Sequence, residues 1–347
     1  MLKTKISLGV CMIILLTTNI FAFFLFASEG KSNDSSDLMD DESIVGIGLT
    51  KNDCNYTIAR LNGYRYTQPL VFAEPSCETV KMGEVKRAIE EKINILKGSG
   101  QIRNASVYVR LFNRGEWISV EDDEKYSPGS LLKVPELITI MKMKEKDPDV
   151  LNTRLYFDKP IEINKTATFI TKGIEPGKYY TVKELLNYMI AHSDNNATYL
   201  LNQFMDIPTF KKVFTDLGLS EPDMTSSDYK ITAKEFSVFM KVLYNASYLS
   251  IRDSEFCTEL LSKCDFSKGL MAGLPEHCNA AHKFGEGGDA KTRTFNLSES
   301  GIVYCKDKTY LITIMTNGPD MKALAPVISS ISRLVHDKLD NYFRENG

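Results

Sequence analysis

A serine and a lysine three positions apart, Ser130 and Lys133, are the first pair whose types and spacing could do chemistry. Pro128 and Gly129 precede the pair and an apolar stretch, 134–143, follows it. This pattern predicts that Ser130 lies on the first turn of a buried helix. Side chains three apart on a helix share one face. Because a desolvated lysine can be neutral and accept the hydroxyl proton, the pair predicts a nucleophilic serine with a lysine base.

An S-x-x-K pair alone is weak evidence, because both residue types are common. About one such pair is expected by chance in a chain of this length. A second pair, Ser227 and Lys230, is indeed present. The ordinary interpretation of either pair in isolation is a capping serine and a solvated lysine, so other residues must decide between them.

Two later motifs bear on that decision. The sequence S-D-N at 193–195 directly follows a predicted amphipathic helix, where a plain turn is the ordinary interpretation. The sequence K-F-G at 283–285 lies on a predicted strand that runs into a glycine-rich turn. The ordered triple S-L-L-K, S-D-N, K-F-G resembles the class A β-lactamase and penicillin-binding-protein superfamily, whose signature is S-x-x-K, S-D-N and K-T-G. The resemblance covers about residues 80 to 345, and it favours Ser130 over Ser227.

The resemblance assigns catalytic roles to three residues. Ser130 attacks a carbonyl carbon and becomes acylated, and Lys133 accepts its proton. Ser193 passes a proton to the leaving nitrogen. Asp194 is expected to brace its loop rather than contact substrate. No metal and no organic cofactor are implied.

The resemblance also assigns the substrate-binding residues. Asn195 holds the substrate amide, and Lys283 supplies positive charge for a substrate carboxylate. The backbone N–H groups of Ser130 and Glu286, with Gly285 beside them, form the oxyanion hole, where one donor contributes a few kcal/mol. The implied function is hydrolysis of a β-lactam amide through a Ser130 ester. A D-alanyl-D-alanine carboxypeptidase or transpeptidase and a penicillin sensor without turnover remain alternatives.

Two departures from the signature bear on the choice among these functions. Phe284 stands where the superfamily has Thr or Ser, so a hydroxyl for the substrate carboxylate is missing. The segment 217–231 lacks the E-x-x-L-N motif whose glutamate activates the deacylating water in class A β-lactamases. Its only carboxylates are those of Glu221, Asp223 and Asp228. A persistent acyl-enzyme, as in a peptidase or a sensor, is the consequence if none of them reaches the acyl bond.

The elements that must position these residues follow from hydrophobic periodicity and turn signals. Helices are predicted at 80–96 and 322–342, and S/T-x-x-E capping boxes at Thr181 and Thr232 open two more. Strands are predicted at 106–112, 116–120, 280–285, 300–305 and 310–316. The order predicts an α+β fold of the β-lactamase/transpeptidase type. It has an antiparallel sheet with flanking terminal helices, and an all-helical lobe at about 130–275.

Other polar residues are weaker candidates. No carboxylate partner is evident for the histidines, which disfavours a Ser-His-Asp triad. His282 is expected to point away from Lys283 and to pack. Trp117 is expected in the core, and Glu286 and Asp289 are expected to carry solvated charges.

The N-terminal residues predict the compartment. Lys3 and Lys5 precede a weakly polar to apolar run, 6–27, whose length favours a retained single-pass membrane anchor over a cleaved signal peptide. A flexible linker at 28–43 then leads to a catalytic domain at 44–347, outside the cytoplasm. A net charge of −3 without a basic patch indicates no nucleic-acid partner. The expected partners are a small-molecule or peptide substrate and the membrane, with a monomeric chain.

Six cysteines follow the apolar run. An even number in an oxidising compartment permits three disulfides, although buried free thiols fit the sequence equally well. No C-x-x-C pair occurs, which disfavours a zinc site.

Overall fold

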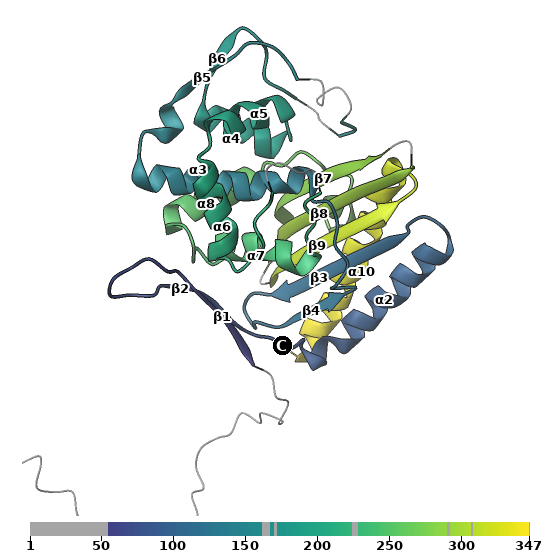
Figure 1. Cartoon of the computed structure of the whole chain (residues 1–347). Helices are drawn as coiled ribbons and strands as arrows, with labels where there is room; N and C mark the ends of the chain where they lie inside the picture. The colour runs from purple at the N-terminus through teal and green to yellow at the C-terminus, as the bar shows by residue number, and fades with distance from the viewer. Residues whose placement is uncertain are drawn as a thin grey trace, which may run out of the picture. The chain divides into compact units, whose positions relative to one another are not determined.

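In a computed structural model of the chain, the structure describes residues 55–161, 167–169, 172–223, 228–289, 292–306 and 308–346 (Figure 1). These belong to one compact unit, residues 54–347. The predicted anchor, the linker and the predicted start of the domain at residue 44 all lie outside the described residues. None of the helices described from residue 55 onward is long and apolar enough to cross a membrane.

A five-stranded antiparallel sheet forms the centre of this unit, in the order β4-β3-β9-β8-β7. Its first two strands precede the helical region and its last three follow it. Strand β3 pairs with β9 from Asn104↔Asn317 to Leu111↔Tyr310, which joins the two groups. The predicted assembly of the sheet from both ends of the chain is therefore confirmed. The bounds are β3 (Asn104–Leu111), β4 (Trp117–Val120), β7 (Asn279–Asp289), β8 (Thr294–Cys305) and β9 (Lys308–Gly318).

One face of the sheet is covered by the two terminal helices, α2 (Gly83–Gly98) and α10 (Met321–Asn346), as Figure 1 shows. Strand side chains alternate between faces. Val107 and Val109 of β3 and Ile312 of β9 therefore share a core with these helices. In α2 the apolar stripe at helical spacing is buried as predicted: Val85, Ile89, Ile93 and Leu96. Each such side chain contributes about 1.5–3 kcal/mol when fully buried.

The opposite face carries the helical lobe. Tyr108, Leu311 and Met315 point to this side and join a second core. Both predicted capping boxes form: Thr181 begins α4 and Thr232 begins α7. The helices between the two strand groups are α3 (Lys133–Lys146), α4 (Val182–Ala191), α5 (Asn195–Phe204), α6 (Ile207–Asp216), α7 (Ala233–Tyr244), α8 (Ile251–Leu261) and the short α9 (Leu270–Gly273).

Two small hairpins were not predicted from the sequence. One pairs β1 (Tyr56–Arg60) with β2 (Leu70–Pro75), and the other pairs β5 (Arg154–Phe157) with β6 (Lys178–Thr181). Strand β1 is mostly exposed and β2, β5 and β6 are only partly buried, so neither hairpin shows the apolar alternation on which strand prediction depends. The first hairpin is tied to the sheet by Glu74, whose carboxylate is ion-paired with both Arg110 and Lys241.

Candidate active site

Ser130 lies in a 3₁₀ turn, η2 (Gly129–Leu132), directly before α3. The sequence placed it on the first turn of the α-helix, whereas the helix begins three residues later, at Lys133. Gly129 adopts φ +51°, a left-handed conformation that glycine tolerates best, and it turns the chain into this short element. Ser130 is half-buried and lines a cleft of about 500 Å³.

The ammonium group of Lys133 is buried and fully hydrogen-bonded. Its Nζ donates to the carbonyl oxygen of Ser193 over 2.7 Å, to the Ser193 hydroxyl over 3.1 Å and to Asn195 Oδ1 over 2.8 Å. Only 3 % of Lys133 is exposed. Burial, reinforced by the nearby charge of Lys283, holds the pKa of Lys133 well below its ordinary value. This is the condition under which a lysine can act as a base.

Ser193 is positioned by an unusual backbone conformation and by its neighbour Asp194. Ser193 has φ +56°, which non-glycine residues seldom adopt outside functional sites and tight turns. The Asp194 carboxylate accepts the backbone N–H groups of Asn196 and Ala197, which caps α5, and also that of Ile174. Asp194 therefore braces the loop, as expected, and its side chain is fully buried.

Lys283 completes the arrangement from the sheet. It lies on β7 with its side chain fully buried, and its Nζ donates to Ser193 Oγ over 2.9 Å and to the Phe284 carbonyl over 2.9 Å. Burial lowers the pKa of Lys283 to about 8. The Ser193 hydroxyl thus accepts from two ammonium groups, and its own proton is free to be donated to a third group.

The serine turn and β7 are in close backbone contact. A Cβ on Gly285 would lie 2.2 Å from the Pro128 carbonyl oxygen, and one on Gly129 would lie 2.3 Å from that of Glu286. Glycine is needed at both positions because no side chain fits. The contact places the backbone of Glu286 beside the Ser130 turn. The oxyanion hole built from their N–H groups stays a prediction that this proximity supports.

The side chains of Glu286 and Phe284 contact the loop residues Thr168 and Phe169 at one wall of the cleft. The sequence placed a solvated charge at Glu286, but its carboxylate accepts the backbone N–H of Thr168 at 2.9 and 3.0 Å and that of Phe169 at 3.4 Å. Phe284 is fully buried and stacks on Phe266, with ring centroids 4.4 Å apart, and its ring meets Phe169 edge-on. Glu286 therefore fixes this loop, and Phe284 packs beneath it.

Three histidines have carboxylate partners, contrary to the sequence-based expectation, the third being His336, whose Nε2 lies 4.0 Å from Asp340 Oδ1. His192 Nδ1 lies 2.7 Å from Asp265 Oδ2, and His282 Nδ1 lies 2.7 Å from Glu299 Oε1. His282 is buried and follows the alternation of β7 away from Lys283. Although burial alone lowers the pKa of His282, Cys264 and Glu299 hold it at about 10. None of these histidines lines the cleft that contains Ser130, so they form no Ser-His-Asp triad there.

The described residues of the segment that lacks the deacylation motif, 217–223 and 228–231, do not line the cleft. None of the carboxylates of Glu221, Asp223 and Asp228 lines it, and Ser227 of the second S-x-x-K pair lies outside the described residues. The cleft instead contains a carboxylate that sequence reasoning missed, that of Glu136 on α3. The sequence did contain one signal for Glu136: it is an acidic residue three positions after Lys133, within an otherwise apolar stretch of helix.

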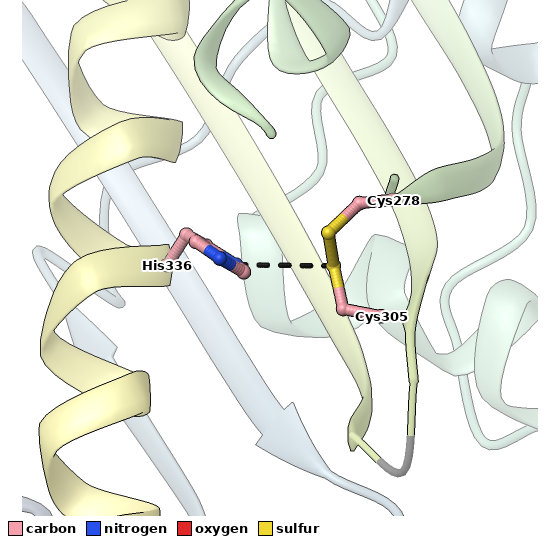
Figure 2. Close-up of side chains that lie close together, drawn as sticks. All are labelled: Cys278, Cys305 and His336. Carbon is pink, nitrogen blue, oxygen red and sulfur yellow. Dashed lines mark hydrogen bonds between the residues drawn. A yellow bond between two sulfur atoms is a disulfide. The ribbon is translucent and has the colours of Figure 1, made fainter. Parts of the chain in front are cut away.

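A cluster of possible metal ligands lies elsewhere, between β7, β8 and α10 (Figure 2). It comprises Cys278, Cys305 and His336, and the two cysteines form a disulfide. Cys305 Sγ lies 3.9 Å from His336 Nδ1. Because the sulfur atoms are bonded to each other, they are not thiolate ligands in this state.

The sequence allowed either disulfides or free thiols for the six cysteines, and the described cysteines include both. Cys77 is also disulfide-bonded, whereas Cys257 and Cys264 are free thiols.

Comparison with known proteins agrees with the fold. The family model described as the β-lactamase enzyme family matches residues 86–339. Among solved structures, PBP-A is 18 % identical with a TM-score of 0.62, and the match covers 74 % of this chain and 96 % of that one. A class A β-lactamase from Bacteroides cellulosilyticus is 17 % identical with a TM-score of 0.63, over 74 % and 99 % of the two chains. A β-lactamase from Xanthomonas campestris is 16 % identical with a TM-score of 0.63, over 74 % and 98 % of the two chains. The search of curated proteins found no match.

Proposed function

The chain belongs to the β-lactamase enzyme family, and on this premise we propose that it is a serine hydrolase that opens the amide of a β-lactam through an ester on Ser130. The observation that carries the proposal is the set of hydrogen bonds behind the nucleophile. Lys133, which follows Ser130 by one helical turn, bonds Ser193 and Asn195, and Lys283 bonds the same Ser193 hydroxyl.

The proposed acylation uses each of these contacts. Lys133, made less basic by burial, accepts the Ser130 proton as Oγ attacks the amide carbon. The oxyanion that forms is held by the backbone N–H groups of Ser130 and Glu286. The Ser193 hydroxyl then donates its proton to the departing nitrogen and recovers one from Lys133, with which it shares a hydrogen bond. Lys283 keeps Ser193 oriented and supplies the positive charge that attracts a substrate carboxylate.

A D-alanyl peptide is the second candidate substrate. It is favoured by the composition of the cleft wall, since none of the carboxylates of the segment 217–231, those of Glu221, Asp223 and Asp228, lines the cleft. A slowly hydrolysed ester suits transfer to an amine or capture of penicillin. One similar structure is an acyl-enzyme complex of a PBP-A variant with penicillin G, at 19 % identity over 74 % of this chain and 97 % of that one, with a TM-score of 0.61.

Mass spectrometry of the full-length protein incubated with penicillin G tests the proposal. We expect an adduct of the penicillin mass on Ser130 that decays as hydrolysed penicillin accumulates, and no adduct in Ser130→Ala. A permanent adduct, together with release of D-alanine from a D-Ala-D-Ala peptide, would favour the peptidase. The absence of an adduct from the wild-type protein with either compound would contradict both candidates.

We also propose that the enzyme is held at the membrane with its catalytic domain outside the cytoplasm. The apolar run at 6–27 supports the anchor. The disulfide between Cys278 and Cys305 suits an oxidising compartment. Labelling of intact cells with an impermeant amine reagent tests this topology, because a cytoplasmic domain would stay unlabelled.

A further inference from the structure

Glu136 places an unpaired carboxylate in the cleft that contains Ser130. It lies on α3 three residues after Lys133, so the two side chains share one face of the helix. Glu136 lines the cleft although only 8 % of it is exposed. Its Oε1 accepts from Asn202 Nδ2 over 3.4 Å, and its Oε2 has no hydrogen-bond partner among the described residues.

A structural role does not account for this arrangement. Buried carboxylates are ordinarily paired with a cation or fully hydrogen-bonded, because an unsatisfied charged oxygen is costly. The cation with the largest effect on Glu136 is that of Lys133, but its three N–H donors are taken by Ser193 and Asn195. The charge of Lys133 therefore lowers the pKa of Glu136, although Lys133 donates no hydrogen bond to it. Glu136 Oε2 is itself buried and has no hydrogen-bond partner among the described residues, so its capacity to accept a hydrogen bond is unfilled.

The other carboxylate of the cleft is already engaged. Glu286 holds the backbone of Thr168 and Phe169. Of the described residues that line the cleft, only Glu136 and Glu286 carry carboxylates. Burial raises the pKa of Glu136 to about 7, against the opposing effects of Lys133 and Asn202. A carboxylate with this pKa can both accept and return a proton near neutral pH.

We propose that Glu136 is the catalytic base that hydrolyses the Ser130 acyl-enzyme, in place of a glutamate from the segment after S-D-N. The inference rests on the proposed function, since it requires an ester on Ser130. The Glu136 carboxylate accepts one proton from a water molecule as the water oxygen bonds to the acyl carbon. The bond between the acyl carbon and Ser130 Oγ then breaks, and Oγ takes up the proton from Glu136. The product leaves as a carboxylic acid with the second proton of the water, and both side chains return to their starting states.

The lifetime of the acyl-enzyme in Glu136→Gln tests this assignment in the full-length protein with penicillin G. Glutamine keeps the shape and the contact with Asn202 but cannot accept the proton. We expect Ser130 to be acylated within a few-fold of the wild-type rate and the adduct to persist about 100- to 10,000-fold longer. The matched control is Glu145→Gln, an exposed carboxylate on the same helix, which should leave the lifetime unchanged.

The outcomes distinguish the role of Glu136 in deacylation from the acylation of Ser130 on which it depends. An unchanged lifetime in a folded Glu136→Gln protein would overturn the role of Glu136 and leave acylation of Ser130 intact. The absence of any adduct in the wild type would remove the proposed function and this inference with it. If the glutamine variant does not fold, the wild-type enzyme decides the question through its pH profile. Deacylation should slow by about tenfold per pH unit below about pH 7, and a flat profile from pH 5 to 8 would overturn the assignment.

Discussion

Lys133 and Lys283 donate hydrogen bonds to the same atom, the hydroxyl oxygen of Ser193, over 3.1 and 2.9 Å. Two buried ammonium groups this close repel each other, which favours the neutral form of one of them. Lys133 is the more affected, since the charge of Lys283 is the second cause of its lowered pKa, after burial. The pair therefore divides two tasks, with Lys133 as the base and Lys283 as the retained positive charge.

The acylation rate should depend on pH with a maximum between two lysine titrations. The rate rises as pH increases through the lowered pKa of Lys133, because the base must be neutral. It falls as pH increases through about 8, where Lys283 loses the charge that attracts a substrate carboxylate. Rapid-mixing assays with a chromogenic cephalosporin at pH 5 to 10 measure both limbs. Lys283→Arg should move the alkaline limb upward, because arginine stays protonated, and an unmoved limb would contradict this assignment.

Lys133→Ala should slow acylation of Ser130 by about 100- to 10,000-fold, the usual contribution of a general base. The adduct formed with a fluorescent penicillin, separated by electrophoresis at timed intervals, gives the rate. Lys230→Ala is the matched control, because it removes the lysine of the second S-x-x-K pair, which is exposed. Equal rates for the two variants would show that the choice of Ser130 and Lys133 was wrong.

Much of the fold could be predicted from local signals. The stripe at Val85, Ile89 and Ile93, the capping boxes and the alternating strands are each specified within a few residues of chain, so the sequence states them directly. The assembly of one sheet from both groups of strands was predicted, but the pairing of β3 with β9 that joins them was not. The hairpin of β1 and β2, which contains Glu74, shows no such periodicity. Its position depends on long-range contacts: its ion pairs with Arg110 and Lys241, the burial of Val71 in the core and the hydrogen bond from Trp117 Nε1 to the Pro75 carbonyl oxygen.

The site was predictable only where the ordered motifs defined it. Ser130, Lys133, Ser193, Asn195 and Lys283 all lie in or directly behind one cleft. The function of a carboxylate, in contrast, depends on which donors surround it. Glu286 was predicted to carry a solvated charge, but its carboxylate accepts the backbone N–H of Thr168. The sequence made no prediction for Glu136, whose Oε2 has no hydrogen-bond partner among the described residues. Periodicity carries no information on such contacts.

Gly285→Ala should abolish acylation or strongly destabilise the protein. The added Cβ would lie 2.2 Å from the Pro128 carbonyl oxygen and 2.8 Å from the Leu131 nitrogen, both backbone atoms that cannot rotate away. The serine turn must therefore separate from β7, which also moves the two N–H groups of the proposed oxyanion hole. Gly98→Ala, at the end of α2 with no atom near its Cβ, is the control and should change stability by no more than about 1 kcal/mol. Acylation assays and thermal unfolding of both variants measure the two effects, and a fully active Gly285→Ala would contradict the close contact.

Glu74→Ala should destabilise the protein although Glu74 is remote from the cleft that contains Ser130. The carboxylate of Glu74 pairs with Arg110 at 2.7 Å and with Lys241, both of which are nearly buried. Burial already lowers the pKa of Lys241 to about 8, and Glu74 opposes that shift. Removing one partner of a buried ion pair leaves uncompensated charge and costs about 3–5 kcal/mol. Urea denaturation should show this loss against Glu84→Ala, whose partner Arg87 is exposed and whose ion pair contributes at most about 1 kcal/mol. Equal stability of the two variants would mean that the first hairpin is held to the sheet by other contacts.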